Sequence, residues 1–131
     1  MIWRMAESEG VASARSLLVG RAVSEVAFVR DYVELRFDGP VFRALSSPYG
    51  RRAGVAWRFP DENAPSMMLE YIGETVDSFT FVDDQFVELG FGANIFGVSL
   101  DYATRTGSEA LNIVGVDEIG ETSVGGGLWV W

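Results

Sequence analysis

The chain has 131 residues, of which 48% are hydrophobic, and it contains neither cysteine nor histidine. This length suits one domain with a buried core, and the hydrophobic content excludes general disorder. The missing residue types exclude disulfides, thiolate sites and Ser–His or Cys–His catalysis, and remove the usual ligands of zinc, copper and non-haem iron. All ten basic residues are arginine, which also excludes Schiff-base lysines and the P-loop lysine.

The net charge of −9 is unevenly distributed. Residues 1–60 contain nine arginines and six acidic residues, whereas residues 61–131 contain one arginine and thirteen acidic residues. Nucleic-acid binding needs a basic surface, so the charge argues against nucleic acid and favours a basic protein partner. No apolar run approaches the roughly 20 residues that span a bilayer. Residues 1–10 lack the apolar stretch of a signal peptide, so we expect a cytoplasmic protein without membrane contact.

Two stretches, residues 13–37 and 66–91, repeat one pattern at an offset of 53 that becomes 54 after one extra turn residue. Each begins with a short apolar segment that ends at a glycine, Gly20 or Gly73, where a helix C-terminus favours a left-handed residue. The pattern predicts helices over 13–19, capped by Ser13, and over about 65–72.

Alternating apolar residues after each glycine predict antiparallel strands with one buried face. A third strand is expected near 41–46 and near 95–101, so each copy is a helix followed by a three-stranded meander. Further predictions are a loop over 46–54, an edge strand over 55–59, a loop over 60–65, strands over 109–114 and 128–131, and a loop over 117–127.

The sequence therefore predicts one α+β, mainly antiparallel β domain over residues 1–131. It contains two repeated helix-plus-meander units, over about 13–46 and 66–101, and C-terminal strands within 109–131. The units share one core, and the strands are expected to form a roll or a partly open barrel. The expected core residues are Val26, Phe28, Val33, Leu35, Phe37, Phe79, Phe81, Val87, Leu89 and Phe91.

Carboxylates are the main candidates for chemistry. Those near the second copy are suited to a hard cation, but no Asp-x-Asp-x-Asp-Gly loop is present, and aspartates such as Asp83 and Asp84 are common in tight turns. Glu34 and Glu88 occupy equivalent repeat positions, which a duplicated polar strand position explains more simply than an acid–base pair. We therefore predict no catalytic, metal-binding or cofactor-binding residue. The carboxylates weighed as metal ligands are Asp61, Glu62, Glu70, Glu74, Asp77, Asp83 and Asp84.

Arginine and aromatic residues give two further candidate surfaces. Arg51, Arg52 and Arg58 with Tyr49 and Trp57 are suited to phosphate or single-stranded nucleic acid, but in a chain of this charge, pairing with the acidic half or a protein contact is favoured. Two tryptophans share one face of the last strand, where closing the core is favoured over anchoring an interface. These are Trp129 and Trp131.

Four short segments, residues 18–23, 37–39, 109–113 and 126–131, resemble a group of small uncharacterised proteins of high-GC bacteria. Some proteins of this kind resemble immunity partners in polymorphic-toxin systems. The resemblance implies the same role here and supplies no catalytic residues.

The function favoured by the sequence is a non-enzymatic acidic binding protein, most concretely an immunity-type inhibitor of a basic toxin domain. The alternatives are a homo-oligomeric structural or regulatory protein, which would use the two C-terminal tryptophans and strand 55–59, and a metal-assisted carboxylate enzyme. The candidate partner-binding residues are Asp61, Glu62, Asp83, Asp84, Asp117, Glu118, Trp129 and Trp131.

Overall fold

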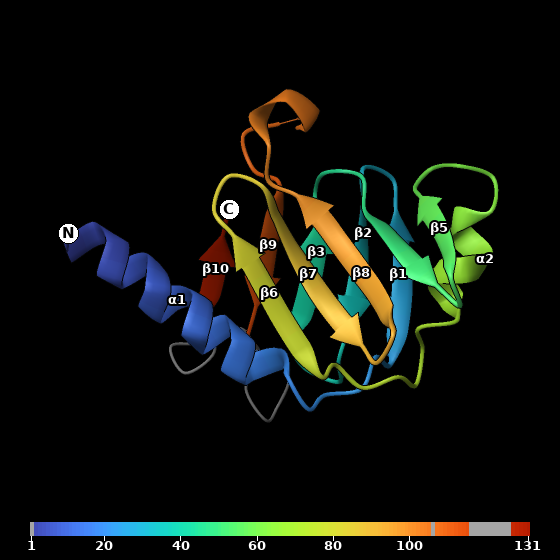
Figure 1. The fold of residues 1–131 in the computed structure, drawn as a ribbon, viewed down its shortest axis with the longest axis horizontal. Helices are drawn as coiled ribbons and strands as arrows, with labels where there is room; N and C mark the ends of the chain where they lie inside the picture. The colour runs from blue at the N-terminus through green and yellow to red at the C-terminus, as the bar shows by residue number, and fades with distance from the viewer. Residues whose placement is uncertain (1, 106, 116–126) are drawn as a thin grey trace.

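The computed structural model is an α+β fold built mainly from antiparallel strands in two sheets (Figure 1). It describes residues 2–105, 107–115 and 127–131, with side chains from Glu9 onward. The first sheet has the order β1 (Glu25–Val29), β2 (Tyr32–Arg36), β3 (Val41–Ala44), β9 (Leu111–Val114) and β10 (Leu128–Val130). The second has the order β5 (Val55–Arg58), β4 (Tyr49–Arg52), β8 (Asn94–Ser99), β7 (Phe86–Phe91) and β6 (Ser78–Val82).

Each sheet joins a three-stranded meander from one half of the chain to a strand pair from the other half. The β4–β5 pair adds to the meander β6–β7–β8 through β8, and the β9–β10 pair adds to the meander β1–β2–β3 through β3. Neither sheet is complete without strands from both halves of the chain. The described strands form two separate sheets and no closed barrel, so the predicted roll or partly open barrel is not confirmed.

Two connecting segments, residues 20–23 and 73–76, pair antiparallel through Ala22 and Thr75, at the bottom of the view in Figure 1. Gly20 N donates to Val76 O at 2.8 Å, and Gly73 N donates to Val23 O at 2.7 Å. Both glycines have positive φ, +95° and +90°, which confirms the predicted left-handed conformation, although the second helix ends before Gly73. These backbone hydrogen bonds hold the start of one meander next to the start of the other.

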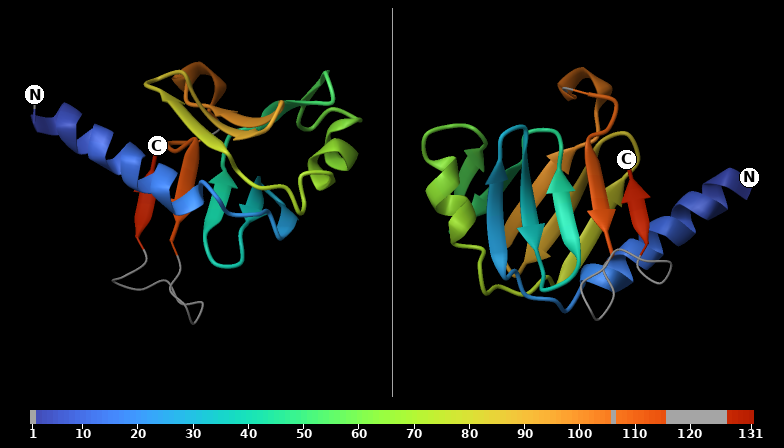
Figure 2. Two further views of the ribbon diagram at one scale, coloured as in Figure 1. Left: turned by 60° about the horizontal axis from the view of Figure 1, so that its bottom comes forward. Right: turned by 180° about the vertical axis from the view of Figure 1, so that it is seen from behind.

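A helix closes each open side between the sheets (Figure 2). Helix α1 (Ile2–Leu18) lies beside β6 and β10, and its N-terminal end extends beyond the sheets. Its buried residues Val11, Ala14 and Leu18 recur at three- and four-residue spacing, as expected for an amphipathic helix. Helix α2 (Ala64–Leu69) contacts β1 and β5 on the opposite side. No helix among the described residues is long and apolar enough to cross a membrane.

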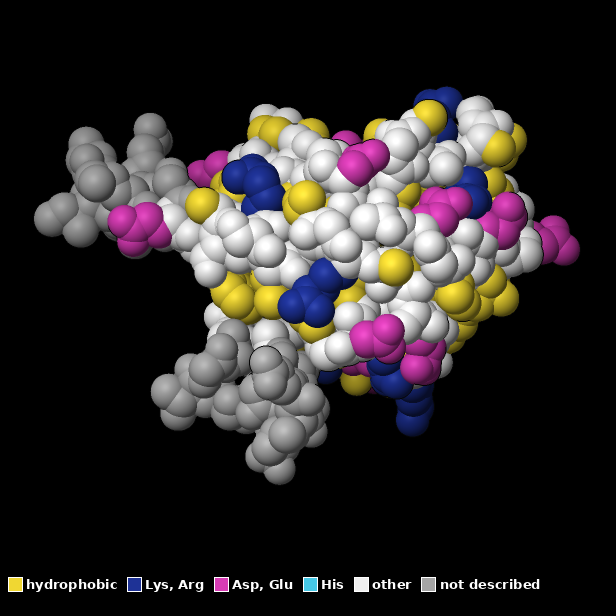
Figure 3. Space-filling view, turned by 90° about the horizontal axis from the view of Figure 1, so that it is seen from below, with side chains coloured by type: hydrophobic (Ala, Val, Ile, Leu, Met, Phe, Trp, Pro, Cys, Tyr) yellow, Lys and Arg dark blue, Asp and Glu magenta, His cyan; other side chains and the backbone are white. Residues whose placement is uncertain are grey.

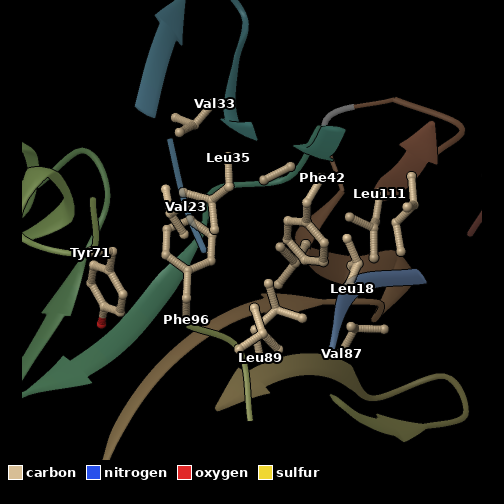
Figure 4. Packing of buried hydrophobic residues seen from close by; sticks show 14 of the residues in the cluster. Leu18, Val23, Val33, Leu35, Phe42, Tyr71, Val87, Leu89, Phe96 and Leu111 are labelled. Atoms are coloured by element: carbon tan, nitrogen blue, oxygen red, sulfur yellow. The ribbon is translucent and has the colours of Figure 1, made fainter. Parts of the chain in front are cut away.

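The core fills the space between the sheets (Figure 4). Phe42 of the first sheet meets Phe96 of the second edge to face, with ring centroids 6.1 Å apart. All but two of the predicted core residues are buried. Phe28 is 43% exposed because it lies on the edge strand β1, where it stacks on Phe59, and Phe81 is only partly buried.

Several predicted boundaries are wrong. The first helix starts at Ile2, so Ser13 lies inside it and does not cap it. Its early turns were missed because Gly10 interrupts the helical pattern. The second helix is shorter than expected and gives way to turns before Gly73. The predicted loop over 46–54 contains strand β4, and a 3₁₀-helix, η1 (Tyr102–Thr104), follows β8.

Candidate functional site

A buried carboxylate marks the outer face of the first sheet. Glu34 is 4% exposed and accepts hydrogen bonds from Arg43 Nε at 2.6 Å and from Arg36 Nε and Nη2 at 3.0 and 2.8 Å. Burial alone would raise the pKa of Glu34, but the hydrogen bonds and charges of Arg43 and Arg36 outweigh it and hold the pKa below 4.5. Arg43 also donates to Asn112 Oδ1 at 3.1 Å. This carboxylate is fully engaged by its own sheet.

The corresponding carboxylate of the second sheet has a different setting. Glu88 faces Gly97 across the strands and precedes Gly90 by two residues, whereas Glu34 faces Arg43 and precedes Arg36 by two residues. Glycines therefore stand where the first sheet has its two arginines. Within the described residues, the one hydrogen bond to the Glu88 carboxylate comes from Tyr49 Oη, at 2.7 Å to Oε2.

Tyr49 reaches Glu88 because Gly97 has no side chain. A Cβ at Gly97 would lie 2.6 Å from Tyr49 Cζ and 2.9 Å from Glu88 Cγ, so the ring rests on the glycine. Burial and then the hydrogen bond to Glu88 raise the pKa of the Tyr49 phenol above its usual value of 10, against the opposing charge of Arg58. Tyr49 is therefore a neutral donor at physiological pH.

A cleft of about 530 Å³ opens beside this pair on the outer face of β4 and β5. Its charged lining residues are Arg51, Arg58, Asp61 and Glu88, and Asn63 supplies an amide. In the described part of the chain, no ion pair joins these four charged groups. The volume lies within the range of small-ligand sites. The cleft thus offers unpaired charges of both signs to a ligand.

The predicted arginine–aromatic surface is divided between this cleft and the core. Tyr49, Arg51 and Arg58 line the cleft, whereas Trp57 is buried beneath it and donates from Nε1 to Tyr71 Oη at 3.0 Å. The fifth member, Arg52, forms an ion pair with Glu74 and lies 4.8 Å from the Tyr71 ring centroid. Arg52 therefore pairs with the acidic half of the chain.

Four of the predicted partner-binding residues lie at one end of the second sheet. Asp61 and Glu62 follow β5, and Asp83 and Asp84 form the turn between β6 and β7. The antiparallel register places the C-terminal ends of β5 and β6 at the same end of the sheet, on opposite edges. We call this region the acidic end. At the other end of the molecule, acidic and arginine side chains are interspersed (Figure 3).

The remaining predicted site residues do not join this group. Trp129 and Trp131 are partly buried and pack against the core, and the rings of Trp131 and Phe81 are tilted relative to each other with centroids 6.0 Å apart. Asp117 and Glu118 lie outside the described residues. Glu34 and Glu88 lie on the outer faces of different sheets and do not form a pair. Among residues 2–105, 107–115 and 127–131, no group of three or more His, Cys, Asp or Glu is placed to hold a metal.

Sequence reasoning missed the cleft itself. It recognised Glu34 and Glu88 as equivalent, but it did not compare their neighbours. The exchange of Arg36 for Gly90 lies within the aligned stretches, and that of Arg43 for Gly97 lies in the strands that follow them. Together these exchanges distinguish a carboxylate that is paired with arginine from one that is not.

Comparisons with family models, curated proteins and solved structures found no match. The main elements of the candidate site are a cleft with charges of both signs and the acidic end beside it.

The stability of the fold should depend on pH through two carboxylates that are paired with arginines, Glu34 and Glu74. Hydrogen bonds from Arg52 lower the pKa of Glu74 below 4.5, as Arg43 and Arg36 do for Glu34. A carboxyl group with a lower pKa in the folded state stabilises the fold above its unfolded pKa, and this stabilisation is lost as the pH falls through the folded value. We therefore expect the free energy of unfolding to fall as the pH drops below about 4.5.

Urea denaturation between pH 7 and pH 2 measures this dependence. Glu34→Gln should be less stable than the wild type at pH 7 and should show a shallower loss below pH 4.5. An equally steep acid loss in this variant would contradict the assignment to Glu34.

Proposed function

We propose that this protein is a non-enzymatic binding protein that holds a basic protein partner against the second sheet. The observation that carries the proposal is the acidic end, where two acidic pairs, Asp61–Glu62 and Asp83–Asp84, stand at opposite edges of one sheet. The outer face between these edges contains the Glu88 cleft, and none of the described helices lies over it (Figures 1 and 2). A basic protein surface would meet negative charge on both sides of an open face.

Electrostatics favours such a complex in its rate and its specificity. A surface of one sign steers an oppositely charged partner and speeds association, and it disfavours partners of like charge. Asp101, which caps η1 after β8, adds a further carboxylate at the acidic end. The net charge of −9 acts in the same direction at long range.

In its most concrete form, the proposed partner is a basic toxin domain and this protein is its cytoplasmic immunity-type inhibitor. The resemblance of four short segments to small proteins of high-GC bacteria supports this form. An inhibitor of this kind needs no catalytic group, because it acts by covering the toxin's basic surface.

The test uses the purified product of a neighbouring gene that encodes a basic domain. We expect a complex with the full chain whose dissociation constant rises steeply with salt, because the attraction is electrostatic. Replacing the acidic end by amides should weaken the complex by about tenfold or more. The variant carries Asp61→Asn, Glu62→Gln, Asp83→Asn and Asp84→Asn.

A matched variant removes the same number of exposed carboxylates elsewhere and should bind within about twofold of the wild type. It carries Glu9→Gln, Glu25→Gln, Asp38→Asn and Glu70→Gln. Equal weakening in both variants would show that the effect comes from net charge alone and not from the acidic end. A partner without a basic surface would overturn the proposal.

A second candidate function, a homo-oligomer, is favoured by the edge strand β10. Leu128 and Val130 are 63% and 46% exposed, whereas Trp129 packs against the core. An edge strand with exposed apolar side chains is suited to pairing with a second copy. Light scattering at two protein concentrations tests this function, and a strict monomer at both would remove it.

We also propose that the chain is one domain made of two copies of a single unit. Three features support this. The sequence pattern repeats at an offset of 53. The bond from Gly20 N to Val76 O has its counterpart, at the same offset, in the bond from Gly73 N to Val23 O. The two sheets have the same order of a meander followed by a strand pair.

A further inference from the structure

The outer faces of the two sheets can be compared position by position, because strand pairing aligns residues into rows across each sheet. Each central row contains one glutamate on the middle strand of a meander. In the first sheet the row is Ala27, Glu34, Arg43, Asn112 and Val130. In the second it is Thr80, Glu88, Gly97, Tyr49 and Arg58.

The first row shows how this surface satisfies a glutamate. The guanidinium of Arg43 donates to Glu34 and lies 5.5 Å from the ring centroid of Tyr32. The planar, delocalised guanidinium suits both contacts, since it pairs with carboxylates and stacks on aromatic faces. The first sheet therefore combines a carboxylate, an aromatic ring and a guanidinium.

The second row has the carboxylate and the ring but no guanidinium bonded to them. Tyr49 Oη uses part of the capacity of Oε2, and no hydrogen bond to Oε1 of Glu88 is present in the described chain. A carboxylate has about four lone-pair sites, so Glu88 has room for a further donor. The cleft reaches both Glu88 and Tyr49, which makes this free capacity accessible to a ligand.

We propose that the Glu88 cleft binds an arginine side chain of the partner, with its guanidinium paired to Glu88 and stacked against Tyr49. This inference rests on the proposed function, because it names the side chain by which a basic protein partner is held. Asp61 lines the same cleft and adds a second negative charge for the guanidinium. Lysine would give the charge but not the planar stacking contact.

The arginines of the cleft specify what must accompany this side chain. Arg51 and Arg58 carry positive charge into the same 530 Å³ space, and neither forms an ion pair among the described residues. Together with Glu88 and Asp61 they leave the cleft with no net charge, so a ligand that brings only a guanidinium leaves Arg51 and Arg58 without a negative partner. The cleft therefore fits an arginine that has a carboxylate beside it in the partner.

The test titrates the isotope-labelled full chain with N-acetyl-L-arginine, which carries a guanidinium and a carboxylate. We expect saturable shifts in the backbone amide signals of Tyr49, Arg58 and Glu88. N-acetyl-L-citrulline has nearly the same shape without the charge, and it should bind at least about tenfold more weakly, since a hydrogen bond to a charged group is lost. N-acetyl-L-arginine amide lacks the carboxylate and should also bind more weakly.

Glu88→Gln should weaken N-acetyl-L-arginine by about tenfold while its amide oxygen still accepts from Tyr49. Asp61 is exposed, so Asp61→Asn serves as a second variant that keeps the fold. It should weaken the binding of N-acetyl-L-arginine less than Glu88→Gln does. Asp38→Asn, in the turn between β2 and β3 of the first sheet, is the matched control and should leave the dissociation constant unchanged. Equal binding of the arginine and citrulline probes, or unchanged binding in Glu88→Gln, would overturn the inference.

The two proposals fail in distinguishable ways. A basic partner that binds wild type and Glu88→Gln equally, with no saturable shift from the arginine probe, would overturn the arginine site and leave the proposed function standing. A saturable, Glu88-dependent shift with no binding of the basic neighbouring gene product would support the site and count against the proposed function.

Discussion

Replacing Tyr71 with alanine is expected to lower the free energy of unfolding by about 3–5 kcal/mol, the range found for large aromatic truncations in cores. Tyr71 is completely buried, and its ring lies 5.2–6.1 Å from those of Phe91, Phe96 and Trp57. Its side chain connects the segment after α2 to strands β5 and β8 on the inner face of the second sheet. Urea denaturation followed by circular dichroism measures the loss.

Tyr71→Phe separates the hydroxyl from the ring. The hydroxyl donates to Ile95 O at 2.6 Å and accepts from Trp57 Nε1, so its removal leaves two buried polar groups without this partner. We expect a loss of about 1–3 kcal/mol, smaller than that of alanine. A phenylalanine variant as stable as the wild type would show that the hydroxyl is not part of what holds β5 and β8 together.

Replacing Gly50 with alanine is expected to cost about 3 kcal/mol or more, at or above the upper end of the usual range for overpacking. A Cβ at this position would lie 2.2 Å from the backbone oxygen of Ile95 and 2.6 Å from Trp57 Cζ2. Neither neighbour can move freely, since Ile95 belongs to the adjacent strand and Trp57 is buried. Strand β4 would have to separate from β8.

The matched control is Gly10→Ala, the same chemical change in helix α1. Apart from its chain neighbours and the nearby helix backbone, no atom of the described residues lies within 4 Å of the added Cβ there, and alanine favours helix over glycine by about 0.5–1 kcal/mol. We expect this variant to be more stable than the wild type. Thermal denaturation of both variants should therefore give shifts of opposite sign, and a destabilised Gly10→Ala would contradict the helical contribution.

The sequence predicted the two meanders well because their signal is local. Alternation places Val33, Leu35, Val87 and Leu89 on buried faces, and all four are buried. Gly20 and Gly73 were predicted to be left-handed from the short apolar segments that precede them, and both have positive φ. Such features depend on neighbouring residues in the chain and need no knowledge of the tertiary fold.

Strand β4 could not be predicted in the same way. The sequence Tyr-Gly-Arg-Arg has no apolar alternation, and its central glycine resembles a turn residue. Gly50 is required for a different reason, because Trp57 and Ile95 approach its backbone. Ile95 is 45 residues away in the chain, and only tertiary pairing brings it there.

The candidate site combines both kinds of information. Asp61, Glu62, Asp83 and Asp84 were recognisable as acidic loop residues, but their common position at the acidic end follows from strand register. The role of Glu88 depends on what surrounds it, and its partner Tyr49 comes from a strand that the sequence did not reveal. Charge was therefore predictable, and the cleft was not.

The exchange of strand pairs between the sheets has a consequence for how the chain folds during synthesis. Strand β3 obtains its second neighbour, β9, only after Val114 has been made, some 70 residues later. Until then the edge of β3 carries unpaired backbone groups, which in nascent chains promote pairing with other molecules. Pairings of such long sequence separation also slow folding, because the chain must close large loops before they form. A ribosome-bound chain that ends before β9 is therefore expected to be the species most in need of chaperone protection.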